Sequence, residues 1–449
     1  MNIILIRPYS SKTRKGFFTT HHPINLCYLA STLQQQRHTV EIWDYCVEPY
    51  IENDFISRLK NAKPDVAALT ALTPHIIQAG KMAETIKKVD SSIITMVGGV
   101  HASGIPQQTA KEFPAVDIVF AGEGEQHFVD AIRKGDSVYC APLIKDMDSY
   151  PIPNREILPL DLYRGSPERG YFHGETHIAQ IYTSRGCPYN CTFCASNVVN
   201  AGRLRYYSKE HVEEELEDCM RLGFNHITVE DDTITTNKSR LYGLCDLMGK
   251  NNLTWNCNSR VDTVNKEILQ YMKDSGCEGI AYGIESGCAE ILKKVCKHVN
   301  LEQAQEALRY SSEVGITNTG ATFILGIHPD ETMDDVEKTV KFLKEITPYI
   351  RALDVSVGVP YPGTAFYEDL VGRGWLSQEI DWNSFNFYNP KQGLWESPHL
   401  DHEVLCKLQR KMLRQFHFRF EYIKQTLKAI KSLGEIWVYV KRGAQCLIR

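Results

Sequence analysis

Three cysteines within eight residues constrain this chain more than any other feature. They are Cys187, Cys191 and Cys194, spaced C-x3-C-x2-C, and they follow an extended run at residues 178–184. Thiolates are soft ligands that suit iron–sulfur clusters and zinc. A closed four-iron cluster takes four cysteines, so three would leave one iron without a protein ligand. An open position on a metal is typical of a reactive site rather than a structural one.

The same cysteines admit two simpler interpretations. A zinc ion could take His177 or His211 as a fourth ligand, but zinc sites usually pair two short clips, and the sequence has no second clip. Cysteine is among the most buried residue types, yet unrelated buried thiols do not usually gather on a polar turn. The pattern therefore favours an iron–sulfur cluster.

The stretch at residues 185–194, Arg-Gly-Cys-Pro-Tyr-Asn-Cys-Thr-Phe-Cys, resembles the signature of the radical S-adenosylmethionine (SAM) superfamily. The resemblance implies that Cys187, Cys191 and Cys194 hold a [4Fe–4S] cluster. It also implies that SAM chelates the open iron through its amino and carboxylate groups. An aromatic residue commonly precedes the third cysteine in that family, and Phe193 matches it, which makes Phe193 a candidate SAM contact.

Residues 1–140 alternate short apolar runs with helical patterns, which predicts a doubly wound parallel sheet. We expect strands at residues 3–6, 39–43, 66–70, 93–97 and 118–120, and helices at residues 26–36, 76–89 and 126–133. Ligands of such sheets bind beyond the carboxyl ends of the strands. Polar and glycine-rich residues gather there: Thr70, Thr73, Gly98, Gly99, His101, Gly122, Glu123, Gly124 and Glu125. The glycines either let backbone approach a large flat ligand or only form the tight turns that every such fold needs.

These motifs, together with His-Pro-Ile-Asn-Leu at residues 22–26, resemble the cobalamin (B12)-binding domain of B12-dependent radical SAM proteins. That family includes cobalamin-dependent methyltransferases and proteins similar to the anaerobic magnesium-protoporphyrin cyclase. The resemblance covers nearly the whole chain. It makes Asn25 and Leu26 candidate cobalamin contacts, along with the strand-end residues above.

One departure concerns the cobalt ligand. Many cobalamin proteins carry Asp-x-His-x-x-Gly, whose histidine ligates cobalt, and the best-placed region here, Trp43-Asp44-Tyr45-Cys46, has no such histidine. Cobalamin is therefore expected to bind without a histidine ligand, or the domain is kept without the cofactor, as in some relatives.

Residues 141–175 are punctuated by prolines and indicate a linker. The family often shows Asp-x-Asp-x-x-Pro-x-Pro at this place, and residues 146–153 match it. Residues 176–390 alternate strand and helix patterns again and resemble the partial (β/α)6 barrel of radical SAM enzymes. The expected strands are residues 178–184, 226–229, 254–258, 279–284, 318–325 and 352–358.

Barrel enzymes carry their chemistry at strand ends, and the resemblance assigns SAM contacts there. Glu230 is expected to hold the amino group, Ser259 and Arg260 the ribose or carboxylate, and Glu285 other polar groups of SAM, while Gly326 lets backbone approach the adenine. An arginine fork suits a carboxylate, and a carboxylate at a barrel mouth is costly unless paired.

Two of these strand ends leave alternatives open. Asp231 and Asp232 either contact SAM or cap the following helix. The fifth strand end departs from the commoner Gly-Phe-Pro-Gly-Glu-Thr, since His328 and Asp330 replace a smaller pair. The adenine contact is therefore less well defined, and His328 could simply face solvent.

Residues 391–449 form a C-terminal helical region in which apolar residues recur at 404, 408, 412 and 416. From residue 401 onward there are eleven Lys or Arg residues against four Asp or Glu. A basic amphipathic helix can meet a membrane surface, an anionic substrate or a partner, or it can pack on the barrel with a solvated basic face. Aromatic residues just before it either line an apolar substrate cavity or form core: Trp382, Phe385, Phe387, Tyr388 and Trp395.

Composition narrows the class further. A net charge of −5 over 449 residues argues against a nucleic-acid-binding protein. Eleven further cysteines are scattered singly, which is not a disulfide framework and indicates a reducing, cytoplasmic location. We find no signal peptide and no apolar run near the roughly 18 residues that span a bilayer.

The resemblance implies that SAM is cleaved reductively to a 5′-deoxyadenosyl radical, with electrons from an external ferredoxin- or flavodoxin-type donor. We expect methylation of an unactivated carbon through methylcobalamin, with substrate between the two domains, whose strand ends face one cavity. Cyclisation, dehydration or carbon–carbon coupling on the same architecture is a second hypothesis. A cobalamin- or redox-sensing protein is a third. The sequence specifies neither the small-molecule or biosynthetic-intermediate substrate nor a catalytic acid or base.

Overall fold

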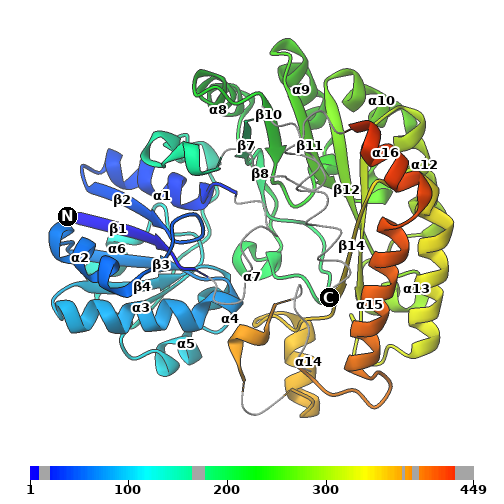
Figure 1. Ribbon diagram of the computed structural model, residues 1–449. Helices are drawn as coiled ribbons and strands as arrows, with labels where there is room; N and C mark the ends of the chain where they lie inside the picture. Colours follow the sequence, from blue (N-terminus) through cyan, green and yellow to red (C-terminus); the bar gives the residue numbers. More distant parts are fainter. Residues whose placement is uncertain (10–20, 164–176, 377–379, 387–393, 430–449) are drawn as a thin grey trace.

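The computed structural model describes residues 1–9, 21–163, 177–376, 380–386 and 394–429. Two α/β units lie side by side, and the helical C-terminal region follows the second (Figure 1). The predicted fold class, a doubly wound sheet followed by a six-stranded partial barrel and a helical tail, is confirmed.

The first unit is built on a six-stranded parallel sheet in the order β2-β1-β3-β4-β5-β6. Its strands are β1 (Asn2–Arg7), β2 (Thr39–Asp44), β3 (Val66–Thr70), β4 (Ile94–Gly98), β5 (Ile118–Ala121) and β6 (Val138–Cys140). Its helices are α1 (Ile24–Gln35), α2 (Glu52–Ala62), α3 (Ile76–Val89), α4 (Val100–Gly104), α5 (Pro106–Glu112) and α6 (Phe128–Lys134). The strand order reverses between β1 and β3, and such a reversal opens a crevice at the carboxyl ends of the strands.

Four elements of this unit were not predicted: β6, α2, α4 and α5. The helices α4 and α5 are only five and seven residues long. The strand β6 is only three residues long and lies at the sheet edge. The helix α2 buries only Phe55 and Leu59, so its sequence shows too little apolar periodicity to reveal a helix.

The second unit holds another six-stranded parallel sheet, in the order β14-β13-β12-β11-β10-β7. Its strands are β7 (Ile178–Ile181), β10 (His226–Val229), β11 (Thr254–Ser259), β12 (Cys277–Glu285), β13 (Asn318–Leu325) and β14 (Ala352–Val357). The helices between them are α8 (Lys209–Arg221), α9 (Lys238–Lys250), α10 (Lys266–Asp274), α11 (Ala289–Lys294), α12 (Leu301–Glu313) and α13 (Met333–Ile346). Because neighbours along the chain are neighbours in the sheet, all six strand ends open toward one mouth, as in a partial barrel.

The first barrel strand is shorter than expected. The prediction of a strand over residues 178–184 was wrong beyond Ile181, since the chain continues as β8 (Ser184–Arg185), which pairs with β9 (Arg205–Tyr206) instead. The cause is Asp231, whose carboxylate accepts hydrogen bonds from the backbone N–H groups of Thr183 and Ser184 at 2.7 and 3.1 Å.

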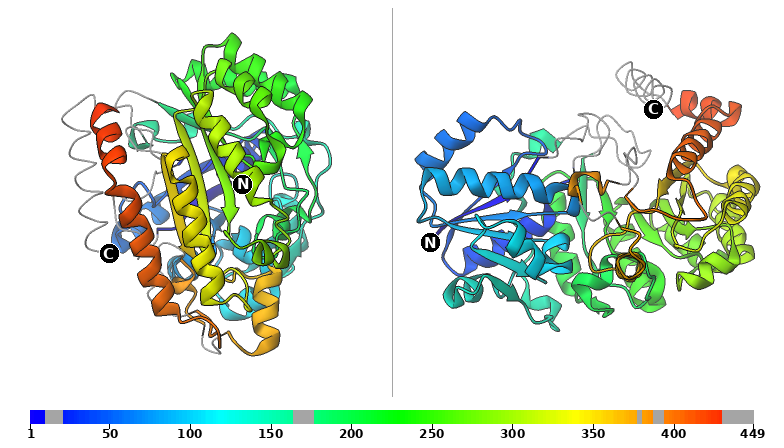
Figure 2. Two further views of the ribbon diagram at one scale, coloured as in Figure 1. Left: turned by 90° about the vertical axis from the view of Figure 1, so that its right-hand side faces the viewer. Right: turned by 90° about the horizontal axis from the view of Figure 1, so that it is seen from below.

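The C-terminal helix α15 (His402–His417) runs along β14 and beside α13 (Figures 1 and 2). It buries Leu405, Met412 and Phe416, and Gln409 donates a hydrogen bond to the carbonyl of Val355 at 2.7 Å. Of the apolar residues that recur at four-residue steps, Val404 is 40% exposed and does not join the buried face. A shorter helix, α16 (Phe420–Ala429), follows, and residues 430–449 lie outside the described residues. Among the described helices, none has the length and apolar character that crossing a membrane requires.

The aromatic segment that precedes α15 belongs to the core. Trp382, Phe385 and Trp395 are all buried in one hydrophobic cluster with residues of the first unit, and Trp382 donates a hydrogen bond to Glu112 at 2.7 Å. For these three residues core packing is therefore the correct alternative. Phe387 and Tyr388 lie outside the described residues.

The two units meet through buried polar groups. Tyr28 of α1 donates a hydrogen bond at 2.7 Å to Glu215 of α8, and Arg155 of the segment between the units pairs with the same carboxylate at 2.5 Å. Arg155 and Glu215 are each 1% exposed at the side chain. Two charges so deeply enclosed depend on each other, because either one alone would lack the solvation it had in water.

We therefore expect Glu215→Ala to destabilise the protein by about 3–5 kcal/mol, the usual cost of leaving one charge of a buried pair unmatched. The measurement is the urea dependence of unfolding, with Glu214→Ala as the matched control because Glu214 neighbours it on α8 but is exposed. Equal unfolding midpoints for the two variants would contradict this assignment.

Candidate active site between the two sheets

The three cysteines lie on one loop after β8, and all are half-buried. The Thr192 N–H donates to the carbonyl of Val295 at 3.1 Å, and the Thr192 carbonyl accepts from the Phe366 N–H at 2.9 Å. Burial raises the pKa of the Cys194 thiol to about 11, and the charges of Asp232, Cys191 and Cys187 raise it as well. The thiols thus lie within electrostatic reach of one another, on a loop anchored from two sides.

This donor set suits a cluster better than a single ion. In the part of the chain that the structure describes, no group of three or more His, Cys, Asp or Glu side chains is arranged to hold one metal ion. His211, considered as a zinc ligand, stacks on the Tyr207 ring with centroids 4.6 Å apart. A cubane takes its ligands at separate corners, so half-buried thiols spread over one loop fit a [4Fe–4S] group.

The backbone at the start of the cysteine loop is held in a restricted conformation. Gly186 has φ of +93°, and a side chain there would collide with the Arg203 carbonyl, so only glycine fits. Asp231 accepts hydrogen bonds from both the backbone and the hydroxyl groups of Thr183 and Ser184. Asp231 therefore positions the approach to the cysteines. The helix-cap alternative for this residue was wrong, because Asn237 caps α9.

Glu285 and Lys297 form a buried ion pair beside the cysteine loop, with 3.1 Å between Nζ and Oε1. Glu285 has a positive φ of 72°, which is rare for a residue with a side chain and marks stored strain. The neighbouring Cys296 and His298 have positive φ values of 56° and 50° as well. Burial raises the pKa of the Cys191 thiol, whereas Lys297 lowers it, so Lys297 lies near the cysteines. No motif in the sequence points to Lys297.

Arg260 and Ser259 both form side-chain hydrogen bonds within the second unit. The Arg260 guanidinium forks onto Asp262 at 2.9 and 2.7 Å and lies 3.7 Å above the Tyr189 ring. The contact of Arg260 with the ribose or carboxylate of SAM stays a prediction. The Ser259 hydroxyl shares a hydrogen bond with Thr235 at 2.5 Å.

Glu230 follows β10 and contacts the first unit. Its Oε1 lies 3.6 Å from Nδ1 of His21, which precedes α1, and its side chain is partly exposed. It can therefore still accept hydrogen bonds from a ligand, as expected for the amino group of SAM.

Two other predicted SAM contacts lie in apolar surroundings. Phe193 packs against a cluster that contains Cys288 and Ile327. At Gly326 the missing side chain would meet Leu405 at 3.0 Å and Trp395 at 3.5 Å. The space on this side of Gly326 is thus filled by the C-terminal region, and the approach of adenine to its backbone stays a prediction.

At the first sheet, the βα turns after β3 and β4 fit a flat ligand. Gly99 has φ of +103°, and a side chain on it would lie 2.7 Å from the Ala71 carbonyl. His101 is fully buried against Trp382, and neither ring nitrogen has a hydrogen-bond partner among the described residues. Burial lowers the pKa of His101 to about 3. A buried imidazole that lacks partners is costly, and polar groups of a bound cofactor would relieve that cost.

The other predicted cobalamin contacts differ in how far they are buried. Thr70 and Gly98 lie at partly exposed strand ends, Thr73 is buried, and Asn25 is exposed. Leu26 was wrongly expected to face the ligand, because its side chain lies in the core of the first unit. Gly122 has φ of +97° and Gly124 adjoins Leu29 and Phe120.

Glu123 and Glu125, also predicted to bind cobalamin, instead pair with arginines of the second unit. Arg205 holds Glu123 at 2.5 and 3.0 Å, and Arg185 lies 2.6 Å from Glu125. Both carboxylates follow β5, and both arginines lie beside the cysteine loop. The carboxyl ends of the two sheets therefore face each other across this contact, as predicted, and α4 touches α7 (Ser196–Asn200) there (Figure 1).

Comparisons with known proteins agree with this geometry. Residues 181–343 match the family model of the Radical SAM superfamily, and residues 16–132 match that of the B12 binding domain. An uncharacterized methyltransferase of Pyrococcus horikoshii is 31% identical over 473 residues, covering 100% of this chain and 98% of the relative. The anaerobic magnesium-protoporphyrin IX monomethyl ester cyclase of Rubrivivax gelatinosus is 25% identical and covers 99% of this chain and 83% of its own.

Solved structures show the same fold. The cobalamin-dependent SAM radical enzyme OxsB, with aqua-cobalamin and SAM bound, matches with a TM-score of 0.75 and 19% identity, over 100% of this chain and 71% of that one. The radical SAM methyltransferase TsrM from Kitasatospora setae matches with a TM-score of 0.68 and 14% identity, over 92% of this chain and 91% of that one.

The chain therefore belongs to the radical SAM superfamily, in the group whose members also carry a B12 binding domain. It is a radical SAM enzyme, and its cofactors are a [4Fe–4S] cluster, SAM and cobalamin.

Glu331 was not singled out from the sequence, yet it organises the turn after β13. It is fully buried, and its Oε2 accepts a hydrogen bond from the Ile327 N–H at 2.8 Å. Burial raises the pKa of Glu331 to about 8. The folded protein consequently holds a proton on this carboxyl that the unfolded chain releases near pH 4.5.

Because the pKa is higher in the folded state, stability should fall as the pH rises from about 5 to 8, by up to about 1.4 kcal/mol per pH unit for this group. Glu331→Gln should flatten that dependence, because glutamine does not titrate. Urea unfolding at several pH values tests this, with exposed Glu337→Gln on α13 as control. The same slope in wild type and Glu331→Gln would contradict the assignment.

Proposed function

We propose that this protein is a cobalamin-dependent radical SAM methyltransferase that acts on an unactivated carbon of a small molecule. One observation carries the proposal: the cysteine loop and the βα turns of the first sheet are joined by buried ion pairs, so two cofactor sites adjoin one another. The relative from Pyrococcus horikoshii supports it, being named a methyltransferase and matching along its whole length.

The proposal assigns roles to residues of this chain. Cys187, Cys191 and Cys194 hold the cluster, and Glu230 and the Glu285–Lys297 pair bind the polar groups of SAM. Bound there, SAM would supply a 5′-deoxyadenosyl radical that removes a hydrogen atom from the substrate, and methylcobalamin would supply the methyl group that replaces it.

On the first sheet, Thr70, Gly98, Gly99 and His101 line the corrin side. The aromatic cluster around Trp382 keeps water away from that edge, since its rings are buried. We divide the chain correspondingly into residues 1–140, 141–175, 176–390 and 391–449.

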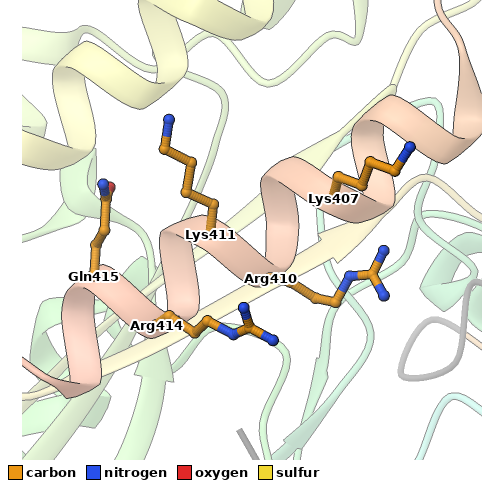
Figure 3. A pocket seen from close by; sticks show the side chains of 5 residues that line it. All are labelled: Lys407, Arg410, Lys411, Arg414 and Gln415. Atoms are coloured by element: carbon orange, nitrogen blue, oxygen red, sulfur yellow. The ribbon is translucent and has the colours of Figure 1, made fainter. Parts of the chain in front are cut away.

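Reducing equivalents reach radical SAM enzymes from outside, and we propose a ferredoxin- or flavodoxin-type protein in the cytoplasm as the donor. The basic face of α15 favours a substrate that carries an anionic group. Lys407, Arg410, Lys411, Arg414 and Gln415 line an open pocket there (Figure 3). Lys407 also pairs with Glu403 at 2.9 Å.

A second candidate is radical chemistry without methyl transfer, such as ring closure. The cyclase relatives favour it, because two of them match 99% of this chain at 25% identity. The two candidates differ in stoichiometry: methylation consumes two SAM for each product and releases S-adenosylhomocysteine, whereas ring closure does not.

The test supplies SAM labelled with CD3 to protein reconstituted anaerobically with iron, sulfide and hydroxocobalamin, and reduces it with dithionite. We expect mass spectrometry to show 5′-deoxyadenosine together with unlabelled S-adenosylhomocysteine, and to show the CD3 group on cobalamin or on the substrate. Methyl transfer is excluded if 5′-deoxyadenosine forms while the CD3 group is found only on methionine and on uncleaved SAM.

Matched cysteine variants complete the test. Cys187→Ala should lose both products, because an incomplete cluster cannot deliver an electron to SAM. Cys140→Ala should keep them, because Cys140 is exposed at the edge strand β6. A fully active Cys187→Ala would instead favour a regulatory role for the cluster.

A further inference from the structure

Arg185 has an unusual environment for a charged side chain. Four tyrosine rings surround its guanidinium, with the carbon at 4.8 to 6.0 Å from the ring centroids of Tyr28, Tyr150, Tyr182 and Tyr207. Tyr28 belongs to the first unit, Tyr150 to the segment between the units, and the other two to the second unit. A stacked, desolvated guanidinium is favourable on aromatic faces, so this cage fixes Arg185 from all three parts of the chain.

Among the described residues, the carboxylates that pair with Arg185 both lie across the interface. Its Nη1 lies 2.6 Å from Glu125 and 3.3 Å from Glu123, and both carboxylates are more than nine-tenths buried. Arg205 takes the remaining oxygen of Glu123 at 2.5 Å and also donates to the Ile144 carbonyl at 2.7 Å. Because these charges have left water, the network is stable only when both units are in place.

This contact joins two cofactor sites: Arg185 lies beside the cysteine loop, and its carboxylate partners lie in the first unit. Arg185 is separated from Cys187 by Gly186 alone, and Gly186 packs so closely against the Arg203 carbonyl that a side chain would not fit. Arg185 is thus two residues from the first cysteine along a closely packed backbone, and we expect a shift of Arg185 to reach that cysteine. Glu123 and Glu125 lie in the Gly-Glu-Gly-Glu turn after β5, between Gly122 and α6 of the B12 binding domain.

We infer that Arg185, with Glu125, is a positioning pair that couples cobalamin binding in the first unit to the geometry of the cluster loop in the second. It acts through its neighbours and touches neither cofactor. The inference requires that both cofactors bind, but not that the reaction is methylation. Coupling between two sites is reciprocal. A change at Arg185 should therefore alter cobalamin binding, and a change at Glu125 should alter the binding of SAM at the cluster.

The first test changes Arg185 and reads cobalamin. Arg185→Gln should raise the Kd for hydroxocobalamin, measured by absorbance titration of the reconstituted protein, by at least about fivefold. Its iron content should stay at the wild-type level. Arg185→Lys keeps the charge without the planar fork, so its Kd should lie between those of wild type and Arg185→Gln.

Arg58→Gln is the matched control. Arg58 also lies over an aromatic ring, 4.3 Å from Trp43, and pairs with a glutamate, Glu48, at 2.9 Å, but entirely within the first unit. Its cobalamin Kd should equal that of wild type. A wild-type Kd for iron-replete Arg185→Gln would overturn the inference.

The reciprocal test changes Glu125 and reads the cluster. Glu125→Gln should retain iron but need at least about five times more SAM to shift the EPR signal of the reduced cluster to its SAM-bound form. This variant also decides the question if Arg185→Gln loses its iron. An unaltered SAM titration for Glu125→Gln would overturn the inference, whatever substrate or reaction is later found.

Discussion

A carboxylate and a guanidinium that are buried together can be satisfied in only a narrow range of arrangements. In this protein such pairs join the carboxyl ends of two parallel sheets, through Glu123 with Arg205 and Glu125 with Arg185. A second set, around Glu215, joins the same units farther back. Apolar contacts alone could slide, whereas these pairs fix how one unit faces the other.

The cysteine loop depends on that arrangement. It is held at its start by Asp231, in its middle by the backbone at Val295, and beside the first cysteine by Arg185. Close to it, Glu285, Cys296 and His298 keep strained backbone conformations. Strain of this kind persists only where the surroundings over-determine it, and it concentrates at functional sites.

The sequence was sufficient for the architecture because strand and helix periods are local properties. It also placed the cysteines, whose spacing is itself the signal. The sequence could not tell which way each side chain points: Leu26 of α1 lies in the core, and Leu405 and Trp395 fill the space beside Gly326. It could not anticipate partners distant in the chain either: Glu123 and Glu125 pair with arginines of the second unit, and Lys297, the partner of Glu285, was missed.

The central claim is that the two cofactor sites adjoin one another across these ion pairs. It is tested most directly by pulsed EPR on protein that holds both cob(II)alamin and the reduced cluster, since both are paramagnetic. The account predicts a resolved dipolar coupling between cobalt and cluster, with one narrow distance distribution. Two independent spectra without coupling would contradict it.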